Sequence, residues 1–206
     1  MSTETKPKKE KKHIKVTFNA PCILVFAIIS LIALILSLIT GGKTNEILFM
    51  TYRSRFTNPL TYLRLFTHVL GHSGWEHFIG NMSFILLLGP MLEEKYGTKK
   101  IAWIMALTAL VTGIIHCVFF ADIALCGASG VVFAFILLTS FTSFKDGELP
   151  VTVILVALIY IGKQVYEGIA VQDNISNLAH IIGGMVGAIV GYHWNRKKPE
   201  TTDSYL

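Results

Sequence analysis

Residues 21–40 read PCILVFAIISLIALILSLIT, a continuous run without a charged side chain. At 1.5 Å per residue, about 20 residues of helix cross the roughly 30 Å hydrocarbon core of a bilayer. The run is longer than the apolar part of a signal peptide, and no A-x-A cleavage site follows it. We therefore predict that residues 21–40 form a retained transmembrane helix.

The composition of the whole chain agrees with this interpretation. Of its 206 residues, 52% are hydrophobic and 15% are charged, and the mean hydropathy is +0.57. Ordinary soluble domains contain about 25% charged residues. The composition therefore excludes a soluble domain, a disordered chain and a disulfide-rich secreted scaffold, and it favours a membrane protein that crosses the bilayer several times.

Five further apolar segments follow the first one. They cover residues 77–92, 101–120, 126–144, 151–166 and 176–194. We predict an all-α membrane protein in which residues 21–194 form a bundle of six transmembrane helices. Between the first two helices, aromatic residues and arginines alternate with aliphatic residues, a pattern typical of short amphipathic pieces that lie in the membrane interface.

The net charge of +5 is concentrated at the two ends of the chain. Lysines crowd residues 1–20, and a second basic cluster lies in residues 195–206. A nucleic-acid-binding protein would instead gather basic and aromatic residues on one face, so we expect no nucleic-acid partner. By the positive-inside rule, both segments are cytoplasmic tails next to the bilayer. With brief tails on a six-helix core, a prokaryotic plasma membrane is the expected location.

Three clusters of polar residues stand out near the starts of the second, fourth and sixth predicted spans. His77 and Asn81 are four residues apart and share one helix face, Ser129 opens the fourth span, and His180 lies in the first turns of the sixth. Polar groups inside a membrane are costly and usually functional. The topology predicted from hydropathy and charge places all of them near the outer face of the bilayer.

These residue types suit acyl transfer. A serine is a weak nucleophile unless a base removes its proton, and a histidine with an ordinary pKa of about 6.5 is mostly neutral at pH 7. We therefore predict Ser129 as the nucleophile and His180 as the general base. His77 and Asn81, with the backbone N–H of Ser129, are predicted to stabilise the oxyanion. No Asp or Glu lies in the fourth or sixth span, so the prediction is a Ser–His dyad.

Glycines on the sixth span support a close approach of two helices. Gly183, Gly187 and Gly191 repeat every four residues, a spacing that lets helices pack tightly in membranes. Packing of the fourth and sixth spans against each other would bring Ser129 within hydrogen-bond reach of His180. Generic helix packing explains the same glycines equally well.

The ordered motifs resemble those of the rhomboid intramembrane serine proteases. They are His77-x-x-x-Asn81, Gly127-x-Ser129-Gly130 and Ala179-His180-x-x-Gly183. The resemblance implies a serine endopeptidase that cleaves transmembrane helices of membrane proteins near the outer face, with no cofactor and no metal. It leaves the oligomeric state open.

The resemblance also implies roles for three neighbouring residues. His68 and His72, upstream of the second span, resemble hydrogen-bonding groups of the fold. Phe133 takes the place of a tyrosine that often stacks on the catalytic histidine. We expect the stacking to persist without the hydroxyl.

Several alternatives are less consistent with the sequence. The H-E-x-x-H motif of metalloproteases is absent, and Asp122, Asp146 and Asp173 fall in loops rather than in a membrane-embedded pair. Val131 replaces the second glycine of the hydrolase G-x-S-x-G motif.

Cys22, Cys117 and Cys126 show no metal-binding or disulfide spacing. A transporter would show repeated halves. The main alternative is a non-cleaving, rhomboid-like binder or chaperone of membrane helices.

Overall fold

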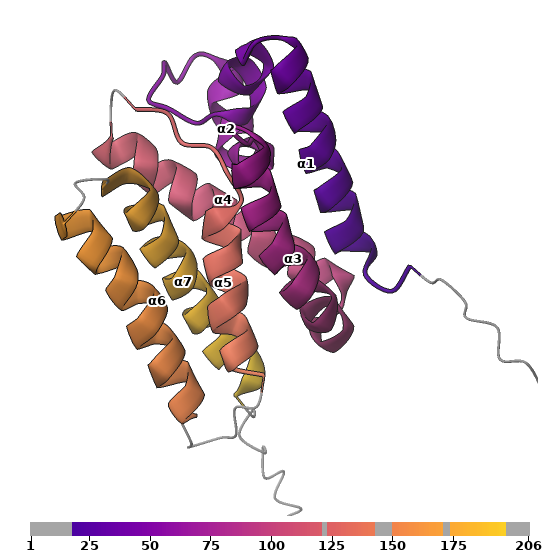
Figure 1. The fold of residues 1–206 in the computed structure, drawn as a ribbon, viewed down its shortest axis with the longest axis vertical. Coiled ribbons are helices and arrows are strands. Elements are labelled where there is room, and N and C mark those ends of the chain that lie inside the picture. Colours follow the sequence, from indigo (N-terminus) through magenta and orange to yellow (C-terminus); the bar gives the residue numbers. More distant parts are fainter. Residues whose placement is uncertain (1–17, 121–122, 143–149, 171–173, 197–206) are drawn as a thin grey trace, which may run out of the picture.

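A computed structural model describes residues 18–120, 123–142, 150–170 and 174–196, and within these ranges the chain is a helical bundle without strands (Figure 1). In chain order the helices are α1 (Pro21–Ile39), the π-helix η1 (Asn45–Phe49), α2 (Pro59–Thr67), the 3₁₀ turn η2 (His68–Leu70), α3 (Trp75–Tyr96), α4 (Thr98–Phe119), α5 (Ser129–Ser140), α6 (Val151–Ala170) and α7 (Asn174–Asn195). The start of α1 and the end of α7 lie at the same end of the bundle, the lower one in Figure 1, and α2 lies at the opposite end.

Helices occur at all six ranges that we predict to span the membrane, namely as α1 and α3 to α7. Among the described residues, two of them, α1 and α4, are long and apolar enough to cross a bilayer by length and composition alone. The apolar helical stretches Ser129–Ser140 and Val151–Tyr160 are shorter than that. The all-helical class is therefore confirmed, and the count of six crossings stays a prediction.

The fourth predicted helix begins later than expected. We predict residues 126–144, but α5 covers Ser129–Ser140. Just before it, Leu125 and Thr51 pair through two backbone hydrogen bonds of 2.9 Å. Gly127 has a φ of +126°, which a helix cannot accommodate. A pairing with a distant part of the chain thus holds residues 125–127 out of the helix.

The N-terminus of α1 is capped from another helix. Its own N-cap residue, Ala20, offers no side-chain acceptor. The buried carboxylate of Glu93, near the end of α3, accepts the backbone N–H groups of Cys22 at 3.0 Å and Ile23 at 3.1 Å. A carboxylate at a helix N-terminus satisfies otherwise unpaired donors and complements the helix dipole. This contact joins α1 and α3 at the lower end of the bundle.

The segment between α1 and α3 folds into short helical pieces, and its place in the membrane interface stays a prediction. Pro59 opens α2, and the side chain of Asn58 caps that helix by accepting the N–H of Leu60 at 3.0 Å. The Asn45 side chain donates to the carbonyl of His72 at 2.8 Å. These bonds hold the segment against the start of α3.

Helix α5 occupies the centre of the bundle. All residues from 130 to 138 are buried, and a helix that is apolar all round belongs in a core. It contacts α3, α4, α6 and α7, and its contact with α7 is the most extensive between any two described helices. The first residue of α5, Ser129, is therefore held by the most enclosed helix of the fold.

Candidate active site

Ser129 is the first residue of α5 and is half-buried. It follows Ala128, which is completely buried, and Gly127 with its positive φ. The first backbone N–H groups of a helix have no partner within the helix, and they carry the positive end of its dipole. The backbone around Ser129 thus provides donors where negative charge could develop.

Helices α5 and α7 touch through their backbones next to Ser129. A Cβ atom placed on Gly183 would lie 2.7 Å from the carbonyl carbon of Gly130, and one on Gly187 would lie 2.7 Å from that of Ala134. A Cβ on Gly130 would lie 3.5 Å from the carbonyl oxygen of Ala179, the residue before His180. The small residues therefore bring the turn of α7 that carries His180 against the first turn of α5.

The imidazole of His180 is stacked on Phe133. Their ring centroids are 4.5 Å apart and the rings are within 5° of parallel. Phe133 lies one turn after Ser129 on α5, is itself buried, and receives the edge of Tyr160 from α6 at 5.8 Å. The stacking expected for Phe133 is present, and it orients the His180 ring from the same helix that carries Ser129.

His77 lies on α3 and faces the loop before Ser129. Its Nε2 atom would be 2.6 Å from a Cβ placed on Gly127. Its Nδ1 atom accepts the backbone N–H of Ser73 at 3.5 Å and lies 3.1 Å from the Ser73 hydroxyl. A neutral histidine that accepts at Nδ1 carries its proton on Nε2. The N–H of His77 is therefore on the atom next to Gly127.

Asn81 lies one turn further along α3 and is 7% exposed. Its Nδ2 group would be 3.7 Å from a Cβ on Gly127 and has no hydrogen-bond partner among the described residues. Buried polar groups normally have partners, so an unsatisfied donor needs an explanation. His77 and Asn81 thus present two N–H groups to the same glycine, two residues before Ser129.

The loop before Ser129 is attached to three other segments. Leu125 pairs with Thr51, the N–H of Gly127 donates to the carbonyl of His68 at 2.9 Å, and Nε2 of His116 donates to the carbonyl of Ile123 at 2.8 Å. These bonds come from three different parts of the chain. The backbone that leads into α5 is therefore held in one position.

The structure brings together segments that lie far apart in the sequence, and this part of the chain matches a known domain in sequence. A sequence model of the rhomboid domain matches residues 59–197, more than half of the chain. The chain belongs to the rhomboid family. Rhomboid proteins are integral membrane proteins. The resemblance seen in the sequence motifs is thus confirmed at the level of the family.

Three relatives illustrate how far this similarity extends. The chain is 26% identical to RHOMBOID-like protein 7 of Arabidopsis thaliana over 63% of its own length and 42% of the plant protein. It is 26% identical to Rhomboid protease GluP of Bacillus subtilis over 79% of its length and 32% of that protein. It is 23% identical to Rhomboid protease GlpG of Haemophilus influenzae over 89% of its length and 91% of that protein. The chain thus spans less than half of the first two relatives and most of the third.

Two buried histidines, His68 and His72, lie next to the candidate site. His68 is 1% exposed and donates through Nδ1 to the carbonyl of Arg64 at 3.2 Å, with Thr112 at 3.4 Å from Nε2. His72 is fully buried and donates through Nδ1 to the carbonyl of Leu70 at 3.1 Å, and its ring packs edge-on against His77 at 5.1 Å. These contacts fit the structural role that the motifs imply for both residues.

Burial keeps both of these histidines neutral. Loss of solvent lowers the pKa of His68 to about 4, and the nearby His116 contributes in the same direction. Loss of solvent also lowers the pKa of His72 to about 4, with a further contribution from His77. Both side chains are therefore uncharged at neutral pH, and they place no positive charge next to the candidate site.

We expect the rhomboid fold to lose stability as the pH falls from 6.5 toward 4. An unfolded histidine titrates near 6.5, so in this window the unfolded chain binds more protons than the native chain. A pKa shift from 6.5 to about 4 corresponds to about 3 kcal/mol for each histidine. Thermal unfolding of the detergent-solubilised chain between pH 7.5 and 4.5 measures this effect.

The exposed His193 provides the matched control for that measurement. His193→Gln should keep the same decline in unfolding temperature as the wild type. An unfolding temperature that stays constant from pH 7.5 to 4.5 would contradict the neutral burial of His68 and His72.

Cys126 lies in the loop before Ser129, and its thiol is unreactive at neutral pH. Burial raises the pKa of its thiol to about 11, so the thiolate that would react is scarce at neutral pH. All three cysteines are free thiols. Within the described ranges, no three His, Cys, Asp or Glu side chains are grouped as metal ligands would be.

Two contacts of the site are not evident from the motifs. Ser73 fixes the tautomer of His77, and their spacing of four residues is the one available signal. Thr51 holds the loop before Ser129 through its pairing with Leu125, but no sequence pattern joins residues so far apart.

Proposed function

We propose that this rhomboid protein is an intramembrane serine endopeptidase that cleaves transmembrane helices of membrane proteins near the outer face of the bilayer. One observation carries the proposal. The backbone contact between Gly130 and Gly183 sets the start of α5 against the turn of α7 that carries His180. The stacking of His180 on Phe133, one turn after Ser129, holds the ring against the helix that carries Ser129.

The reaction proceeds in two halves. His180 removes the proton from the Ser129 hydroxyl as Oγ attacks the scissile carbonyl carbon. The resulting tetrahedral intermediate collapses, and His180 returns the proton to the leaving amine. A water molecule then attacks the acyl-enzyme, again with His180 as the base, and releases the second product and free Ser129.

The oxyanion of the tetrahedral intermediate is stabilised by fixed donors. Nε2–H of His77, Nδ2–H of Asn81 and the backbone N–H of Ser129 are assigned to this role. The unsatisfied, buried Nδ2 group of Asn81 supports the assignment, because a donor held ready for a transient charge has no partner in the resting state. The position of Ser129 at a helix N-terminus adds a favourable dipole.

The orientation in the membrane is part of the same proposal. The basic tails place both termini in the cytoplasm. The start of α1 and the end of α7 lie at the same end of the bundle, and α2 lies at the opposite end. The end of the bundle with α2 is therefore assigned to the outer face, and the substrate helix must unwind there because helical carbonyls are otherwise shielded.

The function is tested by incubating the full chain in liposomes with a model transmembrane substrate and mapping the products by mass spectrometry. We expect a single cut near the outer boundary of the substrate helix. Binding of the substrate without any cut would favour the non-cleaving binder instead. Cleavage that persists when the helix-breaking residues of the substrate are moved from the outer boundary to the bilayer centre would also contradict the proposal.

A chelator adds a second, independent expectation. Because the proposed mechanism uses only side chains and backbone groups, millimolar EDTA should change the cleavage rate by less than about twofold. The same assay with added zinc and magnesium provides the control for nonspecific effects on the liposomes. Strong inhibition by EDTA that a metal ion reverses would point to a metalloprotease.

A further inference from the structure

A cavity of about 520 Å³ lies outside the candidate active site, between α2 and the C-terminal end of α4. This size falls within the range of small-molecule and lipid-chain pockets. Most of its wall is apolar and comes from Phe56, Tyr62, Leu65, Ile114 and Val118. This cavity, called the groove below, lies at the end of the bundle that we assign to the outer face.

The rim of this groove is open to the surroundings. Phe56 is 82% exposed and Val118 is 57% exposed. In a bilayer such side chains face hydrocarbon rather than water. An acyl chain of a lipid therefore matches the groove in both polarity and location.

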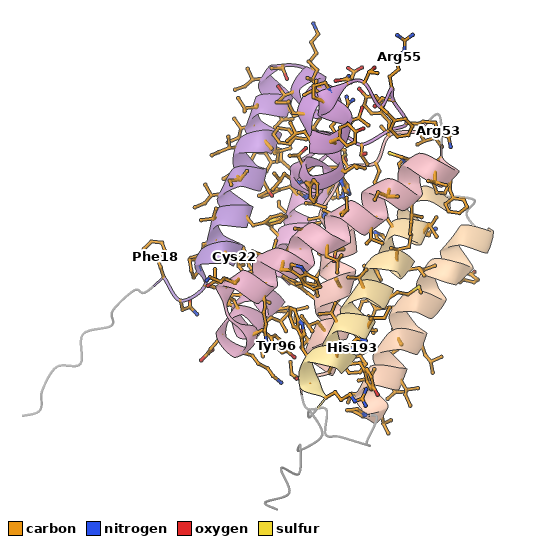
Figure 2. All side chains as sticks on the ribbon, turned by 180° about the vertical axis from the view of Figure 1, so that it is seen from behind. Phe18, Cys22, Arg53, Arg55, Tyr96 and His193 are labelled. Carbon is orange, nitrogen blue, oxygen red and sulfur yellow. The ribbon has the colours of Figure 1, made fainter. Side chains whose placement is uncertain are left out.

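Arg53 marks the polar end of the groove. Its Nε donates to the carbonyl of Cys117 at 2.9 Å and its Nη2 donates to the carbonyl of Val118, so the last turn of α4 holds the guanidinium in place. A guanidinium has five N–H donors, and these bonds leave both N–H groups of Nη1 and the second N–H of Nη2 available. Figure 2 shows Arg53 at the end of α4, with Arg55 beside it pointing away from the bundle.

A second positive charge, that of Arg64, lies next to the lining of the groove, because Arg64 donates to Ser54, one of the lining residues. Arg64 is 2% exposed, lies 4.2 Å above the ring of Tyr52, and donates to the hydroxyl groups of Tyr52 and Ser54. Its Nε has no partner among the described residues. Neither Arg53 nor Arg64 is paired with a carboxylate in the part of the chain that the structure describes. Buried positive charge without a counter-ion favours an anionic ligand nearby.

We infer that this groove binds one glycerophospholipid of the outer leaflet. One acyl chain lies between α2 and α4, and the phosphodiester accepts hydrogen bonds from Arg53. Arginine is suited to this role because its planar fork matches two phosphate oxygens. The inference goes beyond the proposed protease function and rests on it only for the orientation of the bundle in the membrane.

The test uses the full chain with Ser129→Ala in nanodiscs, so that binding is measured without proteolysis. One probe is a phosphatidylglycerol with a diazirine on its acyl chain, and the other is a diacylglycerol with the same diazirine chain and no phosphate. We expect the phospholipid probe to crosslink preferentially to the groove segments of α2 and α4, as mapped by mass spectrometry. The diacylglycerol probe should show no such preference.

Three variants separate the contributions of charge and shape. Arg53→Gln should lower crosslinking at the groove about five-fold, the effect of losing one cationic contact with a lipid phosphate. Ile114→Trp fills the groove while it leaves Arg53 in place, and it should lower crosslinking to a similar extent. Lys43→Gln removes an exposed charge that does not line the groove and should change nothing.

Unfolding temperatures of all variants show whether the fold is intact. Crosslinks spread evenly over the membrane-facing helices, and unchanged by Arg53→Gln and Ile114→Trp, would overturn the inference. Equal labelling of the groove by both probes would also overturn it, because the phosphate would then play no part.

Discussion

Replacing Ser129 with alanine is expected to abolish cleavage while the fold and substrate binding persist. The proposed mechanism has no other nucleophile, and loss of the serine in a serine protease lowers kcat by roughly 10⁴-fold or more. Ser129 is half-buried and lies at the first position of α5, where alanine is tolerated sterically. The measurement is the cleavage rate of a fluorogenic transmembrane substrate in liposomes, with substrate binding measured in parallel.

Ser140 provides a matched control on the same helix. It is also partly buried, and its hydroxyl donates to the carbonyl of Ile136 at 3.1 Å. Ser140→Ala removes a hydroxyl at the far end of α5. It should leave the cleavage rate within about twofold of the wild type, because loss of one hydroxyl away from the candidate site lowers the free energy of unfolding only slightly. A Ser129→Ala chain that still cleaves would disprove the serine mechanism, whatever Ser140→Ala does.

The second large effect is expected from Gly183→Ala. A single methyl group at this position would meet the backbone of Gly130, at 2.7 Å from its carbonyl carbon and 2.9 Å from its Cα. Backbone atoms of a buried helix cannot move aside as a flexible side chain can, so α5 and α7 must separate. Overpacking of this kind costs about 3 kcal/mol, and a displacement of about 1 Å between catalytic groups lowers the rate on the order of 100-fold.

Gly80→Ala is the matched control for this substitution. Gly80 also lies within a helix, but a Cβ there would meet nothing within 4 Å. Alanine is the better helix former, so Gly80→Ala should keep or raise the unfolding temperature. The readouts are the thermal unfolding midpoint in detergent and the cleavage rate. Equal behaviour of the two variants would contradict the close contact between α5 and α7.

The positions of the helices could be predicted from the sequence because each follows from a local property. Long apolar runs predict α1 and α4, and Pro59 with Asn58 opens α2 by capping. The start of α5 could not be predicted in this way. The apolar run continues through residues 126–128, and bonds to distant segments, such as the pairing of Leu125 with Thr51 and the bond from Gly127 to His68, keep these residues out of the helix.

The candidate site was predictable to the extent that polar residues are exceptional inside a membrane protein. His77, Asn81, Ser129 and His180 stand out for this reason, and the structure brings the segments that carry them together. Their catalytic roles stay predictions. The supporting contacts were not predictable, because Glu93 caps a helix some seventy residues away and Arg53 caps the end of α4 from a distant loop.

The short length of α5 has a consequence for the choice of substrate. With 12 residues, the helix is about 18 Å long, against a hydrocarbon core of about 30 Å. In the proposed orientation α5 runs from Ser129 toward the inner face, so the nucleophile is recessed below the outer boundary of the bilayer. A scissile bond must reach this depth to be cut. In the proposed mechanism, the length of α5 therefore sets the position along a substrate that is cleaved, and substrates are selected by the depth of their unstable helical turn rather than by a particular side chain.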